Sequence, residues 1–157
     1  MKLKWKTYAF WIGLSEIAGG ASGLLSMDCM RSFDETVAQP PLSPPGFLFP
    51  IVWTVLYALM GIGAARVSLA DPSRERSRGL NLFVIQLAMN FLWTPVFFCL
   101  KAFGFAFFWL VGLLATVILM ALEFRKTDRP AAWLQIPYIL WLCFAAYLNF
   151  GTWMLSR

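Results

Sequence analysis

Residues 80–124 read LNLFVIQLAMNFLWTPVFFCLKAFGFAFFWLVGLLATVILMALEF, an almost uninterrupted apolar run. One helix of this length would extend about 67 Å, more than twice the roughly 30 Å hydrocarbon thickness of a bilayer. The run therefore has to fold back on itself as a helical hairpin inside a membrane. Lys101 and Gly104 are its clearest interruptions, so we place two spans at residues 80–100 and 103–124.

Three more apolar segments have the length of a membrane span. They occupy residues 7–26, 46–69 and 131–155. With 60% hydrophobic and 13% charged residues and a mean hydropathy of +0.68, the chain lacks the polar surface of a soluble domain. We therefore expect an all-α membrane protein, a single five-transmembrane-helix bundle over residues 1–157, with one long loop at residues 27–45.

The basic residues predict an orientation. With five spans, ten of the 13 Lys and Arg residues lie on the side of the N-terminus. The positive-inside rule then puts the N-terminus in the cytoplasm and the long loop outside, which suits a bacterial cell membrane. Because these residues are dispersed among short loops, we expect no nucleic-acid partner.

The usual metal-binding and catalytic residues are scarce. The chain has no histidine, and Cys29, Cys99 and Cys143 are far apart, without CxxC spacing. A metal site and histidine-based catalysis are therefore not expected, and no cofactor is required.

Aromatic residues share helix faces with polar or small residues in three spans. The residues on these faces are Trp53 and Tyr57 in the second span, Asn90, Trp93 and Thr94 in the third, and Trp141 and Ala145 in the fifth. Rings on such a face offer a surface on which a flat ligand could lie. An amide is costly inside a bilayer, so Asn90 is expected to contact either another helix or a ligand. The other tryptophans read as interfacial anchors or packing residues.

Glu16 is the sole carboxylate well inside a predicted span. Gly19, Gly20 and Gly23 follow on its face, and Gly19 and Gly23 have the GxxxG spacing of close helix contacts. Two interpretations stay open: a protonated Glu16 bonded across a helix contact, or a role in ligand or proton handling. Pro95 and Pro137 lie inside the third and fifth predicted spans and should kink them.

Three segments together resemble the translocator protein family, also called the tryptophan-rich sensory protein or TspO/MBR family. Residues 44–57, PPGFLFPIVWTVLY, resemble its first-loop and second-helix signature. Residues 86–98, QLAMNFLWTPVFF, resemble its third helix, and residues 137–149, PYILWLCFAAYLN, its fifth.

The resemblance implies a five-helix bundle, commonly dimeric, with a pocket beneath the first loop that binds tetrapyrroles such as protoporphyrin IX. Mitochondrial members also bind cholesterol and benzodiazepine-site ligands. The implied ligand-binding residues are Trp53, Tyr57, Asn90, Trp93, Thr94, Trp141 and Ala145. Some bacterial members degrade protoporphyrin in light, and the matching residues here are Trp53 and Trp141.

Two departures separate this chain from the family pattern. Phe33-Asp34 stands where many members carry Trp-Tyr in the first loop, and the sterol-recognition pattern after Asn149 has Phe150 in place of Tyr. Sterol binding therefore gains no support from that motif.

The sequence leaves three hypotheses for the function: a porphyrin receptor or carrier with the first loop as its lid, a light-dependent porphyrin-degrading enzyme, and a scaffold that dimerises through Gly19 and Gly23.

Overall fold

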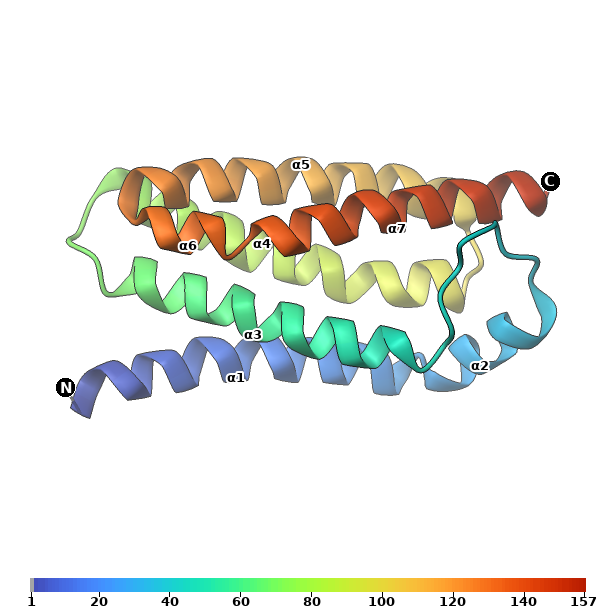
Figure 1. Cartoon of the computed structure of the whole chain (residues 1–157), viewed down its shortest axis with the longest axis horizontal. Helices are drawn as coiled ribbons and strands as arrows, with labels where there is room; N and C mark the ends of the chain where they lie inside the picture. The colour runs from blue at the N-terminus through green and yellow to red at the C-terminus, as the bar shows by residue number, and fades with distance from the viewer. Residues whose placement is uncertain (1) are drawn as a thin grey trace.

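The protein is an elongated helical bundle in the computed structural model, which describes residues 2–157. The five long helices of this described part are α1 (Lys2–Leu25), α3 (Leu48–Ser68), α4 (Arg74–Phe98), α5 (Phe103–Thr127) and α7 (Ile136–Leu155). Two short helices, α2 (Met27–Thr36) and α6 (Arg129–Trp133), complete it, and residues 2–157 contain no strand. The termini lie at opposite ends of the bundle (Figure 1).

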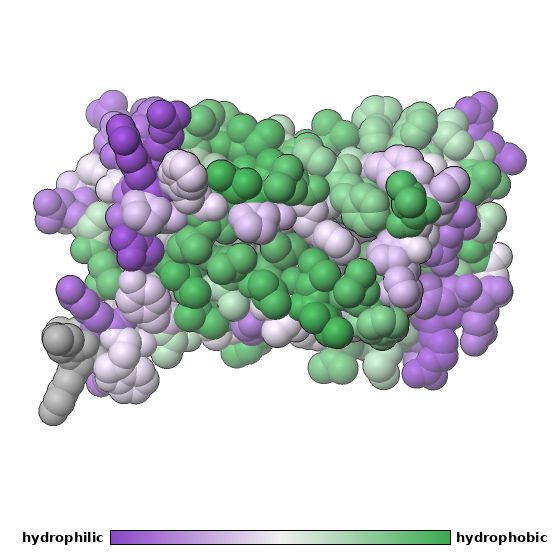
Figure 2. Space-filling model, in the orientation of Figure 1, coloured by the Kyte–Doolittle hydropathy of each residue, from purple (hydrophilic) through white to green (hydrophobic). Residues whose placement is uncertain are grey.

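The surface is that of a membrane protein. Within the described residues, four segments are long and apolar enough to cross a bilayer: Leu48–Ser68, Arg74–Phe98, Phe103–Thr127 and Arg129–Leu155. Large apolar side chains such as Ile17 and Phe108 are exposed, as lipid-facing residues are. Figure 2 shows mostly hydrophobic residues across the middle of the face in view and hydrophilic residues at both ends. The chain is therefore an all-α integral membrane protein. α1, which carries Lys4, Lys6 and Glu16, falls outside these four segments.

The predicted hairpin is formed by α4 and α5. α5 begins at Phe103, the residue at which the fourth span was predicted to begin. Lys101 lies in the connecting turn with a left-handed backbone, φ 51°, a conformation that lets the chain reverse within a few residues. Gly104, by contrast, is inside α5, and its missing side chain leaves room for the indole of Trp153.

The span predicted at residues 131–155 corresponds to the apolar segment Arg129–Leu155, but its helix is interrupted. α6 ends at Trp133, and α7 begins at Ile136 with Pro137 in its first turn. Proline is tolerated there because the first N–H groups of a helix have no intrahelical partner. Pro137 therefore starts a second helix instead of kinking the middle of a longer one.

The prediction of a continuous loop over residues 27–45 is also wrong, because α2 occupies its first half. Cys29 forms a disulfide with Cys99, the residue that follows α4. One turn later, Phe33 is buried, with its ring centroid 5.2 Å from that of Phe97 and 4.9 Å from that of Phe98. These two residues fasten an otherwise polar helix to the end of α4.

The rest of residues 27–45, after α2, is held against α7. The Tyr147 hydroxyl donates a hydrogen bond to the carbonyl oxygen of Pro41, at 2.7 Å. The Pro40 ring lies where a side chain at Gly151 would begin, 2.5 Å from the position of its Cβ. The segment thus crosses the end of the bundle from α2 to α7 and returns to α3 (Figure 1).

α1 packs along α3 at backbone distance. A Cβ added at Gly61 would lie 2.5 Å from the Ile12 Cα and 2.7 Å from its backbone nitrogen. Main-chain atoms cannot move aside as a flexible side chain can. Glycine at position 61 is therefore required for the contact between these two helices.

We expect Gly61→Ala to lower the free energy of unfolding by about 1–3 kcal/mol, because the added methyl group forces α1 away from α3. Circular dichroism during denaturation of the detergent-solubilised protein measures this. Gly13→Ala is the matched control, since a Cβ at Gly13 meets no heavy atom within 4 Å. Equal stability of the two variants would contradict the proposed packing of α1 against α3.

Candidate functional site

A cavity of about 650 Å³ lies at the end of the bundle covered by α2. Its walls come from α1, α3, α4 and α7, and its roof from α2 and the segment that follows it. Six of the seven residues predicted to bind ligand line it: Trp53, Tyr57, Trp93, Thr94, Trp141 and Ala145. The seventh, Asn90, lies behind the wall. Ligand binding by these residues stays a prediction, and their convergence on one cavity is its geometric basis.

Indole and phenol rings from α3, α4 and α7 line the cavity. Trp53 stacks on Tyr57 along α3, with centroids 5.5 Å apart and planes at 29°. The Trp141 ring from α7 meets Trp53 edge to face, at 6.3 Å and 89°. Trp93 of α4 stacks on Phe97 at 5.0 Å. Three tryptophans from three helices therefore present aromatic surface to the same space.

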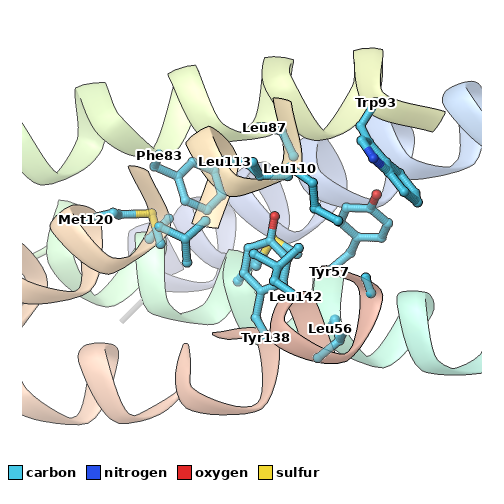
Figure 3. Close-up of a cluster of buried hydrophobic side chains, with 14 of the residues drawn as sticks. Leu56, Tyr57, Phe83, Leu87, Trp93, Leu110, Leu113, Met120, Tyr138 and Leu142 are labelled. Atoms are coloured by element: carbon cyan, nitrogen blue, oxygen red, sulfur yellow. The ribbon is translucent and has the colours of Figure 1, made fainter. Parts of the chain in front are cut away.

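Asn90 connects three helices through a buried chain of hydrogen bonds. The Tyr57 hydroxyl donates to Asn90 Oδ1 at 2.9 Å, and Asn90 Nδ2 donates to the Tyr138 oxygen at 2.7 Å. The Tyr138 hydroxyl in turn donates to Gln86 Oε1 at 2.7 Å. Figure 3 shows Tyr57 and Tyr138 pointing into the buried cluster of the bundle. Asn90 was expected to contact either another helix or a ligand, and in the structure it contacts the neighbouring helices α3 and α7.

A second polar link closes the bundle near the roof. Trp93 Nε1 donates to Asn149 Oδ1 at 3.2 Å, and Asn149 Nδ2 donates to the Phe103 carbonyl oxygen at 2.8 Å. The N–H group of Trp93 is therefore committed to the protein. Trp141 differs, because its Nε1 is buried and has no partner among the described residues. The Trp141 N–H is thus unpaired but buried, although the residue lines the cavity.

Glu16 also lines the cavity, a placement that the sequence left open. It forms no hydrogen bond or ion pair with another residue of the described chain. The helix contact that was one of its two interpretations is not present, and a role toward the contents of the cavity remains. The Tyr57 ring lies against Gly19, so Gly19 allows a close contact within this chain, and a dimer contact through Gly19 and Gly23 stays a prediction.

Charged and polar groups gather at the roof. Arg31 and Asp34 of α2 line the cavity together with Gln39, whose Nε2 donates to Asp34 Oδ1 at 3.5 Å. Arg31 forms no ion pair with another described residue. An unpaired guanidinium above an aromatic cavity suits a flat ligand that carries an acidic group at one edge.

Sequence reasoning did not identify the roof residues of α2 or the disulfide. A signal for the disulfide was available, since Cys29 and Cys99 stand just beyond, or at the end of, two predicted spans whose ends lie on the same side of the membrane. The first loop was predicted as a lid, but no residue of α2 was named as a cavity residue because residues 27–45 were expected to form a loop. Their position over the cavity depends on the formation of α2.

Fold and cavity define the class of protein: an all-helical integral membrane protein with an aromatic-lined cavity beneath an extramembrane helix. The chain belongs to the TspO/MBR family, whose model matches residues 11–154. It is 37% identical over 123 residues to Protein CrtK of Rhodobacter capsulatus, covering 78% of this chain and 77% of the relative. It is 34% identical over 145 residues to the tryptophan-rich protein TspO of Chlorobaculum tepidum, covering 92% of both chains. The translocator protein of Ovis aries is 37% identical over 123 residues, 75% of this chain and 71% of the relative.

We expect Asn90→Leu to destabilise the protein by about 1–2 kcal/mol, because the hydroxyls of Tyr57 and Tyr138 would lose their shared partner in a buried site. Unfolding in a denaturing detergent, followed by circular dichroism, measures the difference. The matched control is Asn81→Leu on the same helix, where the asparagine is exposed and no hydrogen bond is lost. An Asn90→Leu variant as stable as the parent would show that the network does not hold the helices together.

Proposed function

We propose that this protein is a membrane receptor or carrier that binds porphyrins, tetrapyrroles like protoporphyrin IX, and related flat hydrophobic ligands in the cavity beneath α2. The observation that carries the proposal is the convergence of Trp53, Trp93 and Trp141 from three helices on one space. Its volume, about 650 Å³, falls within the roughly 300–1,000 Å³ typical of small-molecule sites. Aromatic walls of this kind favour a large planar ligand.

The polar groups of the cavity suit the same ligand class. A porphyrin of this type has an apolar macrocycle with two carboxylates along one edge. The macrocycle would stack against Trp53 and Trp141, and the carboxylate edge would face Arg31 at the roof. The carboxyl group of Glu16, which also lines the cavity, would provide a further polar contact.

We also propose that all five long helices cross the membrane, with the N-terminus in the cytoplasm of a bacterial cell. The close approach of α1 to α3 supports this, because α1 runs beside a helix that itself has the length and composition of a span. The Cys29–Cys99 disulfide supports the orientation, since it belongs to the end of the bundle that carries few basic residues. Disulfides persist outside the reducing cytoplasm. A homodimer, which the family resemblance implies, is also part of this proposal.

A light-dependent porphyrin-degrading enzyme is the second candidate. It is favoured by the contact between Trp53 and Trp141, whose rings lie 6.3 Å apart and both line the cavity. A pigment bound there would contact two oxidisable indoles. Illumination of the complex with and without oxygen distinguishes the candidates: a defined product that needs both protein and oxygen favours the enzyme, and bleaching at the rate of free pigment favours binding alone.

Replacing either wall tryptophan should weaken porphyrin binding. We expect Trp53→Ala and Trp141→Ala each to cost about 1–3 kcal/mol of stacking energy, or roughly five-fold to over a hundred-fold in affinity for protoporphyrin IX. Quenching of tryptophan fluorescence during titration measures the affinity. Trp5→Ala is the control, because Trp5 is 61% exposed and outside the cavity. Folded variants that bind as tightly as the parent would favour the scaffold hypothesis.

Arg31 should recognise the acidic edge of the ligand. We expect Arg31→Gln to weaken binding of protoporphyrin IX about two- to five-fold, the range of a partly exposed ion pair. Binding of the dimethyl ester, which has no carboxylates, should not change. Lys101→Gln is the control, because Lys101 lies at the same end of the bundle but does not line the cavity. Equal weakening for acid and ester would contradict an ion pair with Arg31.

A further inference from the structure

The roof of the cavity depends on a helix with few attachments. α2 contributes five of its ten residues to the cavity lining: Met27, Met30, Arg31, Phe33 and Asp34. Phe33 is also the one buried residue of α2. A helix of ten residues is marginally stable by itself in water. The position of α2, and with it the closure of the cavity, is therefore set by the groups that fasten it.

Two such groups stand one turn apart on the same face of α2. Cys29 is bonded to Cys99, and Phe33 packs against the rings of Phe97 and Phe98. Both attachments reach the C-terminal end of α4. If the disulfide were opened, the ring of Phe33 would be the remaining buried anchor of the helix, together with the chain connections at its ends.

We propose that the thiol–disulfide state of Cys29 and Cys99 regulates the release of ligand from the cavity. In the disulfide state α2 stays over the cavity and a bound ligand leaves slowly. In the dithiol state α2 detaches more often from the end of α4, and the ligand leaves faster. This inference rests on the proposed function, because it concerns the same cavity and the same class of ligand.

A small dithiol can drive the change by thiol–disulfide exchange. One thiolate of the reductant attacks a sulfur of the Cys29–Cys99 bond and forms a mixed disulfide, and its second thiolate then displaces the protein sulfur. Two electrons pass to the cysteine pair, both sulfurs end as protonated thiols, and the reductant becomes a disulfide. Exchange with an oxidised dithiol reverses each step.

The dissociation rate of protoporphyrin IX from the full-length protein tests the proposal. Stopped-flow fluorescence on nanodisc-embedded protein should show release at least about five-fold faster after treatment with dithiothreitol, since a local opening of α2 becomes more frequent. The double variant Cys29→Ser/Cys99→Ser should release at the fast rate with or without dithiothreitol. Cys143→Ser, which removes the exposed free cysteine, should respond to dithiothreitol as the parent does.

Hydrogen exchange provides a readout that needs no ligand. Reduction should speed exchange of the backbone amides of residues 27–36 about ten-fold, while exchange in α5 stays unchanged. If protoporphyrin IX binds but leaves at one rate in both redox states, the regulation is wrong and the proposed function stands. If it does not bind the oxidised protein, the proposed function fails, and the regulation fails with it. Unchanged exchange in α2 after reduction would also overturn the regulation.

Discussion

A polar side chain inside a bilayer has to find its partner within the protein, and this requirement organises the bundle. Asn90 satisfies it by joining Tyr57 of α3 and Tyr138 of α7 to its own helix, and Gln86 extends the chain of hydrogen bonds on α4. Three helices are thereby fixed in register at one level. Tyr57 belongs to both regions, because its hydroxyl lies in this network while its ring lines the cavity.

These hydrogen bonds show which polar side chains join the helices and which line the cavity without a partner. Trp93 uses its N–H to hold Asn149, and Asn149 reaches the start of α5. Trp141 leaves its buried N–H unpaired, and Glu16 forms no hydrogen bond or ion pair with another described residue; both residues line the same cavity. The hydrogen bonds that join the helices therefore do not use the carboxyl group of Glu16.

The sequence was sufficient to predict the hairpin, the helical class and the convergence of the aromatic residues, because apolar run lengths and helical periodicity act within single segments. It was insufficient where neighbouring segments decide the outcome. α2 is a polar ten-residue stretch, and its fastening by Cys29 and Phe33 depends on the end of α4. Asn90 was compatible with a ligand or a helix partner, and its hydrogen bond to Tyr138 depends on a distant segment that local periodicity does not place. Pro137 was read as a kink because the break after Trp133 has no strong signal of its own.

We propose the cavity beneath α2 as the site at which a porphyrin binds. The most direct measurement is an experimental structure of the protein saturated with protoporphyrin IX in a lipid bilayer. We expect density for the macrocycle between the rings of Trp53 and Trp141, with its carboxylate edge toward Arg31 and the hydrogen bonds of Asn90 unchanged. Density for the macrocycle on the lipid-facing surface of the bundle, with the cavity empty, would contradict it.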